Sequence, residues 1–194
     1  MNQQLINNTI SYIKALFAGN ADGHDAEHSL RVYKNALAIA SGYPECDLLF
    51  ISLASLLHDV DDHKLFQTEN NANARAFLEK QGVSESTIER IVMIINSVSF
   101  SKNKGKTPDT LEGKIVQDAD RLDAMGAIGI ARTFAYGGKK GRSLEDSVQH
   151  FYDKLLLLRD TLNTDEARVL ADKRHTFMEQ FLEELKEEMP FFIK

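Results

Sequence analysis

The chain has 194 residues, of which 43% are apolar and 27% are charged, so it can bury a core and is neither disordered nor fibrous. Its net charge of −6 disfavours a general nucleic-acid binder, whose surface is normally basic. Its single cysteine, Cys46, excludes an internal disulfide and a cysteine-rich zinc site.

The sequence contains no segment that predicts a membrane or export function. No apolar run approaches the roughly 18–20 residues that cross a bilayer. Residues 1–17 lack the basic start and the unbroken apolar stretch of a signal peptide. We therefore expect a cytoplasmic protein with no membrane partner.

Apolar residues recur at helical spacing along the chain, and no alternating run predicts a strand. The expected fold is an all-α bundle of about eight or nine helices. The predicted helices span about 2–18, 25–41, 46–59, 69–81, 85–97, 111–124, 126–135, 144–162 and 165–188. A lysine-rich loop is predicted over 99–110 and a glycine-rich loop over 136–142.

The chain is interpreted as a single domain over residues 1–194. It has a motif-bearing core at about 20–140 and C-terminal helices at about 144–188. No internal repeat, low-complexity tract or clear linker divides it.

Histidines and aspartates gather on the inward faces of three predicted helices. His28 shares a helix face with the apolar Val32 one turn later. His58 and Asp59 end a helix that is otherwise nearly all apolar, and Asp120 lies on the apolar face of a later helix. Three segments that are distant in sequence therefore direct ligand-type side chains toward the interior.

Such a cluster has the composition of a site for one divalent metal ion. Buried carboxylates need a cationic partner, and a divalent ion would satisfy the two aspartates together with the two imidazoles. Two nitrogen and two oxygen donors leave open positions on a six-coordinate ion. This set suits Mn, Fe, Co, Ni or Mg better than a closed structural zinc site.

The order His28, His58-Asp59, Asp120 resembles the HD superfamily of metal-dependent phosphohydrolases. The surrounding sequence is similar as well: HDAEHSLRV at 24–32, LASLLHD at 53–59 and DADRLDA at 118–124. The longer pattern looks like that of the small stand-alone bacterial HD hydrolases, some of which are nucleotide pyrophosphohydrolases. The resemblance covers about residues 20–140 and implies an all-helical fold with one divalent metal held by these four residues.

Three aspartates compete for the last ligand position. The family pattern assigns it to Asp120, in the Ala-Asp pair that precedes Arg-Leu. Asp123 lies one turn later and is assigned a supporting place beside the ligands. Asp118 lies about 200° round the helix from Asp120 and is interpreted as a surface or helix-start residue.

Asp62 is the predicted proton carrier. It stands four residues after His58 and would project over the same face if the helix continued for one more turn. HD phosphohydrolases often carry an acidic residue or a histidine there, so the resemblance assigns Asp62 general acid–base work, with Asp61 as the alternative. His63 is assigned a supporting place in the same segment.

Positively charged side chains near these segments are the candidates for substrate phosphate. Arginine holds phosphate through two parallel hydrogen bonds, and loops can order over a polyphosphate. The assigned set is His24, Arg31, Lys64, Lys102, Lys104, Arg121 and Lys139.

The expected activity is that of a metal-dependent phosphohydrolase acting on nucleotides. By family analogy, the preferred reaction cleaves a nucleoside triphosphate to the monophosphate and pyrophosphate. The alternatives are a nucleoside monophosphatase or a cyclic-nucleotide phosphodiesterase, and outside enzymes a nucleotide-sensing HD module. The expected partner is a small phosphorylated molecule rather than nucleic acid, and a homodimer is left open.

Overall fold

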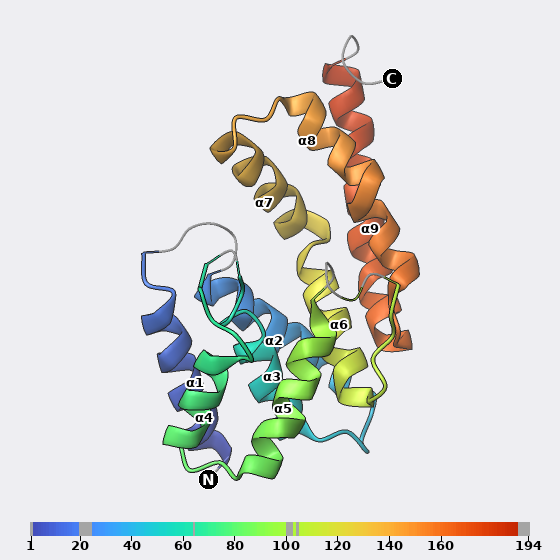
Figure 1. Ribbon diagram of the computed structural model, residues 1–194. Coiled ribbons are helices and arrows are strands. Elements are labelled where there is room, and N and C mark those ends of the chain that lie inside the picture. Colours follow the sequence, from blue (N-terminus) through green and yellow to red (C-terminus); the bar gives the residue numbers. More distant parts are fainter. Residues whose placement is uncertain (1, 20–24, 64, 100–102, 104, 190–194) are drawn as a thin grey trace. The chain divides into compact units, whose positions relative to one another are not determined.

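The computed structural model describes residues 2–19, 25–63, 65–99, 103 and 105–189. Within this part of the chain there are nine α-helices, two short helical segments of other types and no strand (Figure 1). The all-α prediction is therefore confirmed. The chain forms two compact units, Met1–Asp120 and Arg121–Lys194.

The first unit is organised around one apolar helix. It contains α1 (Asn2–Leu16), α2 (Ala26–Ala40), α3 (Leu48–Leu57), α4 (Ala72–Lys80), α5 (Glu85–Val98) and most of α6 (Leu111–Asp123). Helix α3 packs against α1, α2 and α5 (Figure 1). All of its residues from Phe50 to Leu57 are buried, because a helix that is apolar all round has no face to offer to water.

Side-chain caps set the starts of the helices that lead to the predicted site. The carboxylate of Asp25 accepts a hydrogen bond from the backbone N–H of His28 at 2.7 Å and begins α2. Asp47 accepts from the N–H of Leu49 at 2.9 Å and begins α3. Ser84 caps α5 in the same way. These caps agree with the helix starts predicted from sequence to within two residues.

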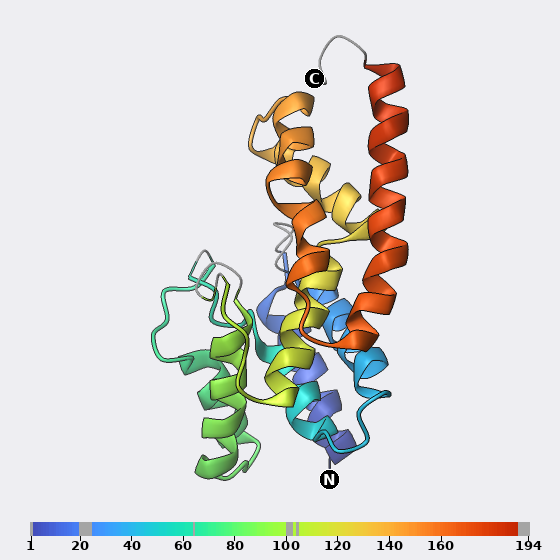
Figure 2. The same ribbon diagram turned by 90° about the vertical axis from the view of Figure 1, so that its right-hand side faces the viewer.

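The second unit packs its helices around a cluster of phenylalanine rings. It contains α7 (Gly126–Lys139), α8 (Leu144–His150), a π-helical segment η1 (Phe151–Leu155), a 3₁₀ segment η2 (Leu156–Thr161) and α9 (Asp165–Glu188). Figure 2 shows α9 as one long helix. The rings of Phe134, Phe151 and Phe181 lie 5.8–6.2 Å apart.

Two predicted helix boundaries in this unit are wrong. Helix α7 continues through the glycines to Lys139. Gly137 packs so closely on Ser147 that a Cβ at position 137 would lie 2.4 Å from the Ser147 hydroxyl oxygen, so glycine serves close packing here and does not end the helix. The predicted helix 144–162 changes to π and then 3₁₀ hydrogen bonding at Phe151, which is fully buried in the ring cluster.

Within the described part of the chain, no helix combines the length and the apolar character that a membrane span requires.

The central place of α3 predicts an asymmetric response to leucine truncation. Leu53 is fully buried and Leu48 is 54% exposed on the same helix. Leu53→Ala should lower the free energy of unfolding by about 2–5 kcal/mol, because it leaves a cavity in the core. Leu48→Ala should change it by no more than about 0.5 kcal/mol. Urea denaturation followed by circular dichroism measures both, and equal losses would contradict the central position of α3.

Candidate metal centre

The four side chains predicted as metal ligands lie together in the first unit. The Nε2 atoms of His28 and His58 are 3.2 Å apart. Asp120 Oδ1 lies 3.4 Å from His28 Nε2 and 3.8 Å from His58 Nε2. Asp59 presents one oxygen to each ring, Oδ2 at 3.4 Å from His28 and Oδ1 at 3.5 Å from His58.

Local structure explains how these residues meet. His28 lies in the first turn of α2, just after its cap. His58 is the C-cap residue that directly follows α3, and Asp59 lies in the same turn. Asp120 lies in the last turn of α6, which α2 holds through a hydrogen bond from the Asn35 amide to the Ala119 carbonyl at 3.2 Å. The inward position of Asn35, two turns after His28, is the sequence signal for this contact.

The two histidines of the cluster are more deeply buried than the two aspartates. The side chains of His28 and His58 are 3% and 4% exposed, whereas those of Asp59 and Asp120 are 13% and 24% exposed. The imidazoles therefore form the buried floor. The carboxylates are the members of the cluster that are most accessible to solvent.

A hydrogen bond from the His58 ring to the backbone determines which ring nitrogen can bind a metal ion. Its Nδ1 lies 2.8 Å from the carbonyl oxygen of Ser55. Because a carbonyl oxygen only accepts, Nδ1 must carry the proton and donate it. The neutral ring then presents the lone pair of Nε2 to the cluster, which is the arrangement found at histidine ligands of metals.

Asp120 remains a carboxylate in this setting. Burial by itself raises the pKa of Asp120, but the hydrogen bond from His28 and the charges of His58 and His28 outweigh burial and bring the pKa below its usual value. The negative charge of Asp59 acts in the opposite direction. The cluster therefore contains an ionised carboxylate that faces the two histidine rings.

The donor set fits a divalent metal ion. Atoms bound at about 2.0–2.2 Å to one ion lie roughly 3.0–3.5 Å apart when they are neighbours around it. Most of the measured separations fall in this range. His28, His58 and Asp120 form a group of potential ligands whose donor atoms lie within 4.8 Å of one another. A shared cation would offset the repulsion between donor atoms that lie this close together in a largely buried place.

Asp62, the predicted proton carrier, lies in a tight turn and not in the helical turn that the sequence predicts. Helix α3 ends at Leu57, so the continued helical turn that was to aim Asp62 is not present. Instead, the N–H of Asp62 donates to the Asp59 carbonyl at 3.0 Å in a tight turn. The Asp62 side chain is 13% exposed and lies 3.6 Å from Nδ1 of the exposed His63.

Asp61, the alternative proton carrier, has both carboxylate oxygens engaged elsewhere. They accept hydrogen bonds from the backbone N–H groups of Asn73 and Ala74 at the start of α4, at 2.9 Å and 3.0 Å. These bonds join residues separated by 12 and 13 positions, so no local sequence pattern predicts them.

The remaining predicted contacts are spread over both units. Arg31 is half-buried on α2, one turn after His28, in the first unit. In the second unit, Lys139 is exposed, and Arg121 is 5% exposed and donates to the Thr161 carbonyl. His24, Lys64, Lys102 and Lys104 lie outside the described residues.

The two other aspartates of this segment, Asp118 and Asp123, are both buried. Asp118 is fully buried, so its interpretation as a surface residue is wrong; its neighbours Val116 and Ala119 are buried too, because α6 is enclosed on more sides than its pattern indicates. Asp123 is 2% exposed and forms an ion pair with Arg132 at 2.5 Å inside the second unit. Its supporting role beside the ligands stays a prediction.

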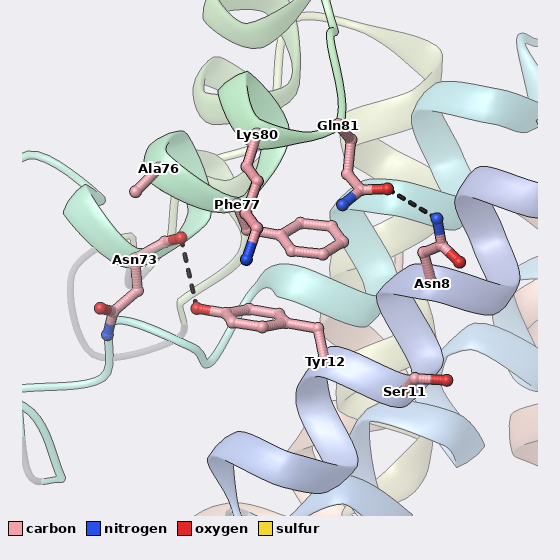
Figure 3. A pocket seen from close by; sticks show the side chains of 8 residues that line it. All are labelled: Asn8, Ser11, Tyr12, Asn73, Ala76, Phe77, Lys80 and Gln81. Carbon is pink, nitrogen blue, oxygen red and sulfur yellow. Dashed lines mark hydrogen bonds between the residues drawn. The ribbon is translucent and has the colours of Figure 1, made fainter.

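A separate cavity of about 440 Å³ lies between α1 and α4 (Figure 3). Tyr12 and Phe77 stack across it with ring centroids 4.4 Å apart, and the amide of Asn8 donates to that of Gln81 at 2.6 Å. Much of its polar and aromatic lining is thus already paired across the two helices. Sequence reasoning singled out none of these residues.

This geometry defines an all-helical protein in which two histidines and two aspartates gather, with donor atoms that could share a divalent cation. The HD domain family model matches residues 25–125. The YpgQ protein of Bacillus subtilis (strain 168) is 39% identical over 189 residues, which cover 93% of this chain and 91% of YpgQ.

Two solved structures are similar over nearly the whole chain. That of Bacillus subtilis YpgQ in complex with ADP has a TM-score of 0.84 at 33% identity and covers 98% of both chains. That of an HD-superfamily hydrolase from Bacillus thuringiensis has a TM-score of 0.81 at 40% identity and covers 98% of this chain and all of the other. The chain belongs to the HD domain family and is an HD-superfamily hydrolase, which confirms the resemblance seen in the sequence.

The His58 geometry predicts a specific loss of metal binding. The unaltered protein should gain about 2.7 kcal/mol of stability when Mn²⁺ is present at 100 times its Kd. His58→Ala should lose that gain, because one of four ligands is missing. His150→Gln, at a half-buried histidine of α8, should keep it. Thermal unfolding with and without Mn²⁺ measures the gain, and its persistence in His58→Ala would remove His58 from the site.

Proposed function

We propose that this protein is a metal-dependent phosphohydrolase that cleaves nucleoside triphosphates to monophosphates and pyrophosphate. The observation that carries the proposal is the meeting of the imidazoles of His28 and His58 with the carboxylates of Asp59 and Asp120. A nucleotide substrate is supported by the ADP complex of the similar YpgQ. The choice of triphosphate rests on the resemblance to pyrophosphohydrolases.

In this proposal His28, His58, Asp59 and Asp120 hold one divalent ion. When bound, such an ion supplies Lewis-acid chemistry: it draws charge from phosphoryl oxygens and makes water a stronger acid. The buried imidazoles fix the position of the site. The more exposed carboxylates face the side from which substrate arrives.

Asp62 is proposed to take the proton from the attacking water. Its carboxylate is partly shielded from solvent and lies in the turn directly after Asp59. His63, 3.6 Å away, would supply a polar partner that keeps Asp62 oriented. General acid–base catalysis of this kind typically contributes about 10²–10⁴-fold to a rate.

Cationic side chains are proposed to neutralise the phosphoryl oxygens, where charge builds up in the transition state. Arg31 is the candidate from α2, because it lies one turn from His28 on the same helix. His24, Lys64, Lys102 and Lys104, together with Arg121 and Lys139, remain candidates of the same kind.

Phosphorus NMR on a panel of nucleotides with Mn²⁺ tests the proposed reaction. Pyrophosphate released from a triphosphate is the expected result. Orthophosphate from a monophosphate, or opening of a cyclic nucleotide, would favour a phosphatase or a phosphodiesterase instead. Nucleotide binding with bound metal and no turnover of any compound would favour a sensing module.

A substitution at Asp62 separates proton transfer from metal binding. Asp62→Asn should lower kcat by about 10²–10⁴-fold, because the amide cannot accept the proton. Its Mn²⁺ affinity by calorimetry should stay that of the unaltered protein. Asp160→Asn, at a side chain that is 81% exposed, serves as the control and should leave both quantities unchanged. An unchanged kcat in Asp62→Asn would show that another group carries the proton.

A further inference from the structure

The segment after the His58–Asp59 pair is fastened to the start of α4. Asp61 Oδ1 accepts a hydrogen bond from Asn73 N at 2.9 Å, and Asp61 Oδ2 accepts one from Ala74 N at 3.0 Å. The side chain of Asn73 returns a bond, from Nδ2 to the Val60 carbonyl at 2.8 Å. We call these three hydrogen bonds the Asp61–Asn73 clamp.

The start of α4 needs this outside carboxylate. Its own N-cap residue, Asn71, has a left-handed backbone with φ of 56° and makes no side-chain capping bond. The first N–H groups of a helix have no partner within it, and they favour negative charge through the helix dipole. Asp61, which stands ten residues before Asn71, supplies both the hydrogen-bond acceptors and the negative charge.

Helix α1 supports the same junction (Figure 3). The Tyr12 hydroxyl donates to the Asn73 carbonyl at 3.3 Å, and its ring stacks on Phe77 one turn further along α4. Asn8 reaches Gln81 at the end of α4. Burial and then the charge of Asp61 raise the pKa of Tyr12, so its hydroxyl keeps the proton that it donates. The start, middle and end of α4 are therefore all tied to α1.

The clamp acts on the backbone that carries the metal-site carboxylate. Val60 is fully buried, and the Asp62 N–H closes a turn on the Asp59 carbonyl at 3.0 Å. With Val60 and Asp61 bonded to α4, the turn 59–62 has little freedom to move. Asp59 precedes the clamped residues directly and Asp62 follows them.

We propose that Asp61 and Asn73 are positioning residues of the metal centre: the clamp holds the 59–62 turn so that the Asp59 carboxylate reaches both imidazoles. The inference rests on the proposed metal site. It gives Asp61 a role other than proton transfer, since a carboxylate whose two oxygens each accept a backbone N–H is poorly placed to exchange a proton with water.

Asp61→Asn tests the clamp with little change of size, because it replaces one acceptor oxygen by an NH₂ group that faces an N–H. The Kd for Mn²⁺, measured by calorimetry on metal-free protein, should rise about 10-fold or more, as for other groups that orient metal ligands. At saturating Mn²⁺, kcat should fall much less than the affinity. Asn73→Ala, which removes only the bond to Val60, should change the affinity in the same direction.

Ser84→Ala is the matched control for loss of a helix cap. Ser84 caps α5 as Asp61 caps α4, because its hydroxyl oxygen accepts a hydrogen bond from the Thr87 N–H, but Ser84 has no bond to the 59–62 turn. It should lower Tm to a similar extent and leave the Kd for Mn²⁺ unchanged.

Three results would overturn the inference. One is a loss of Tm in Asp61→Asn and Asn73→Ala with the same Mn²⁺ affinity as the unaltered protein, which would make the clamp purely structural. Another is Asp61→Asn with normal Mn²⁺ affinity and no turnover, which would restore Asp61 as the proton carrier. Failure of the unaltered protein to bind Mn²⁺ would instead refute the proposed function, and the inference with it.

Discussion

Two imidazole nitrogens and two carboxylates crowd into a space a few ångströms wide, and this crowding is the constraint that the first unit is built to satisfy. Electron-pair donors 3.2–3.8 Å apart repel one another unless a proton or a metal cation lies between them. Holding them there requires rigid supports on several sides. The helices of the first unit supply those supports, each in a different way.

Helix α3 holds His58 in place because the helix itself is buried in the apolar core. Its residues from Phe50 to Leu57 are enclosed, so its C-terminal end cannot shift without disturbing the core. His58 at that end is oriented by the carbonyl of Ser55, one turn earlier on the same helix. The partial negative charge of a helix C-terminus also favours a cation beside it. Core packing and ligand orientation are therefore properties of one short segment.

The carboxylates depend on polar contacts instead. Asp120 is placed by α6, which α2 holds through the Asn35 amide. Asp59 lies in a turn outside any helix, and it is there that the Asp61–Asn73 clamp acts. A ligand on a loop needs such a tether, because a loop lacks the packing that fixes a residue on a helix. The α1–α4 junction thus connects to the site, although its own residues carry no ligand chemistry.

The sequence by itself determined the helical class, the presence and approximate place of the helices in the first unit, and the four residues that meet. These depend on local periodicity and on residue types in a recognisable order, as with His58 and Asp59 at the end of an apolar run. Only the tertiary structure decided that α3 stops at Leu57, that Asp118 is buried and that Asp61 caps α4. Each of these depends on a partner far away along the chain, and no local pattern encodes such a partner.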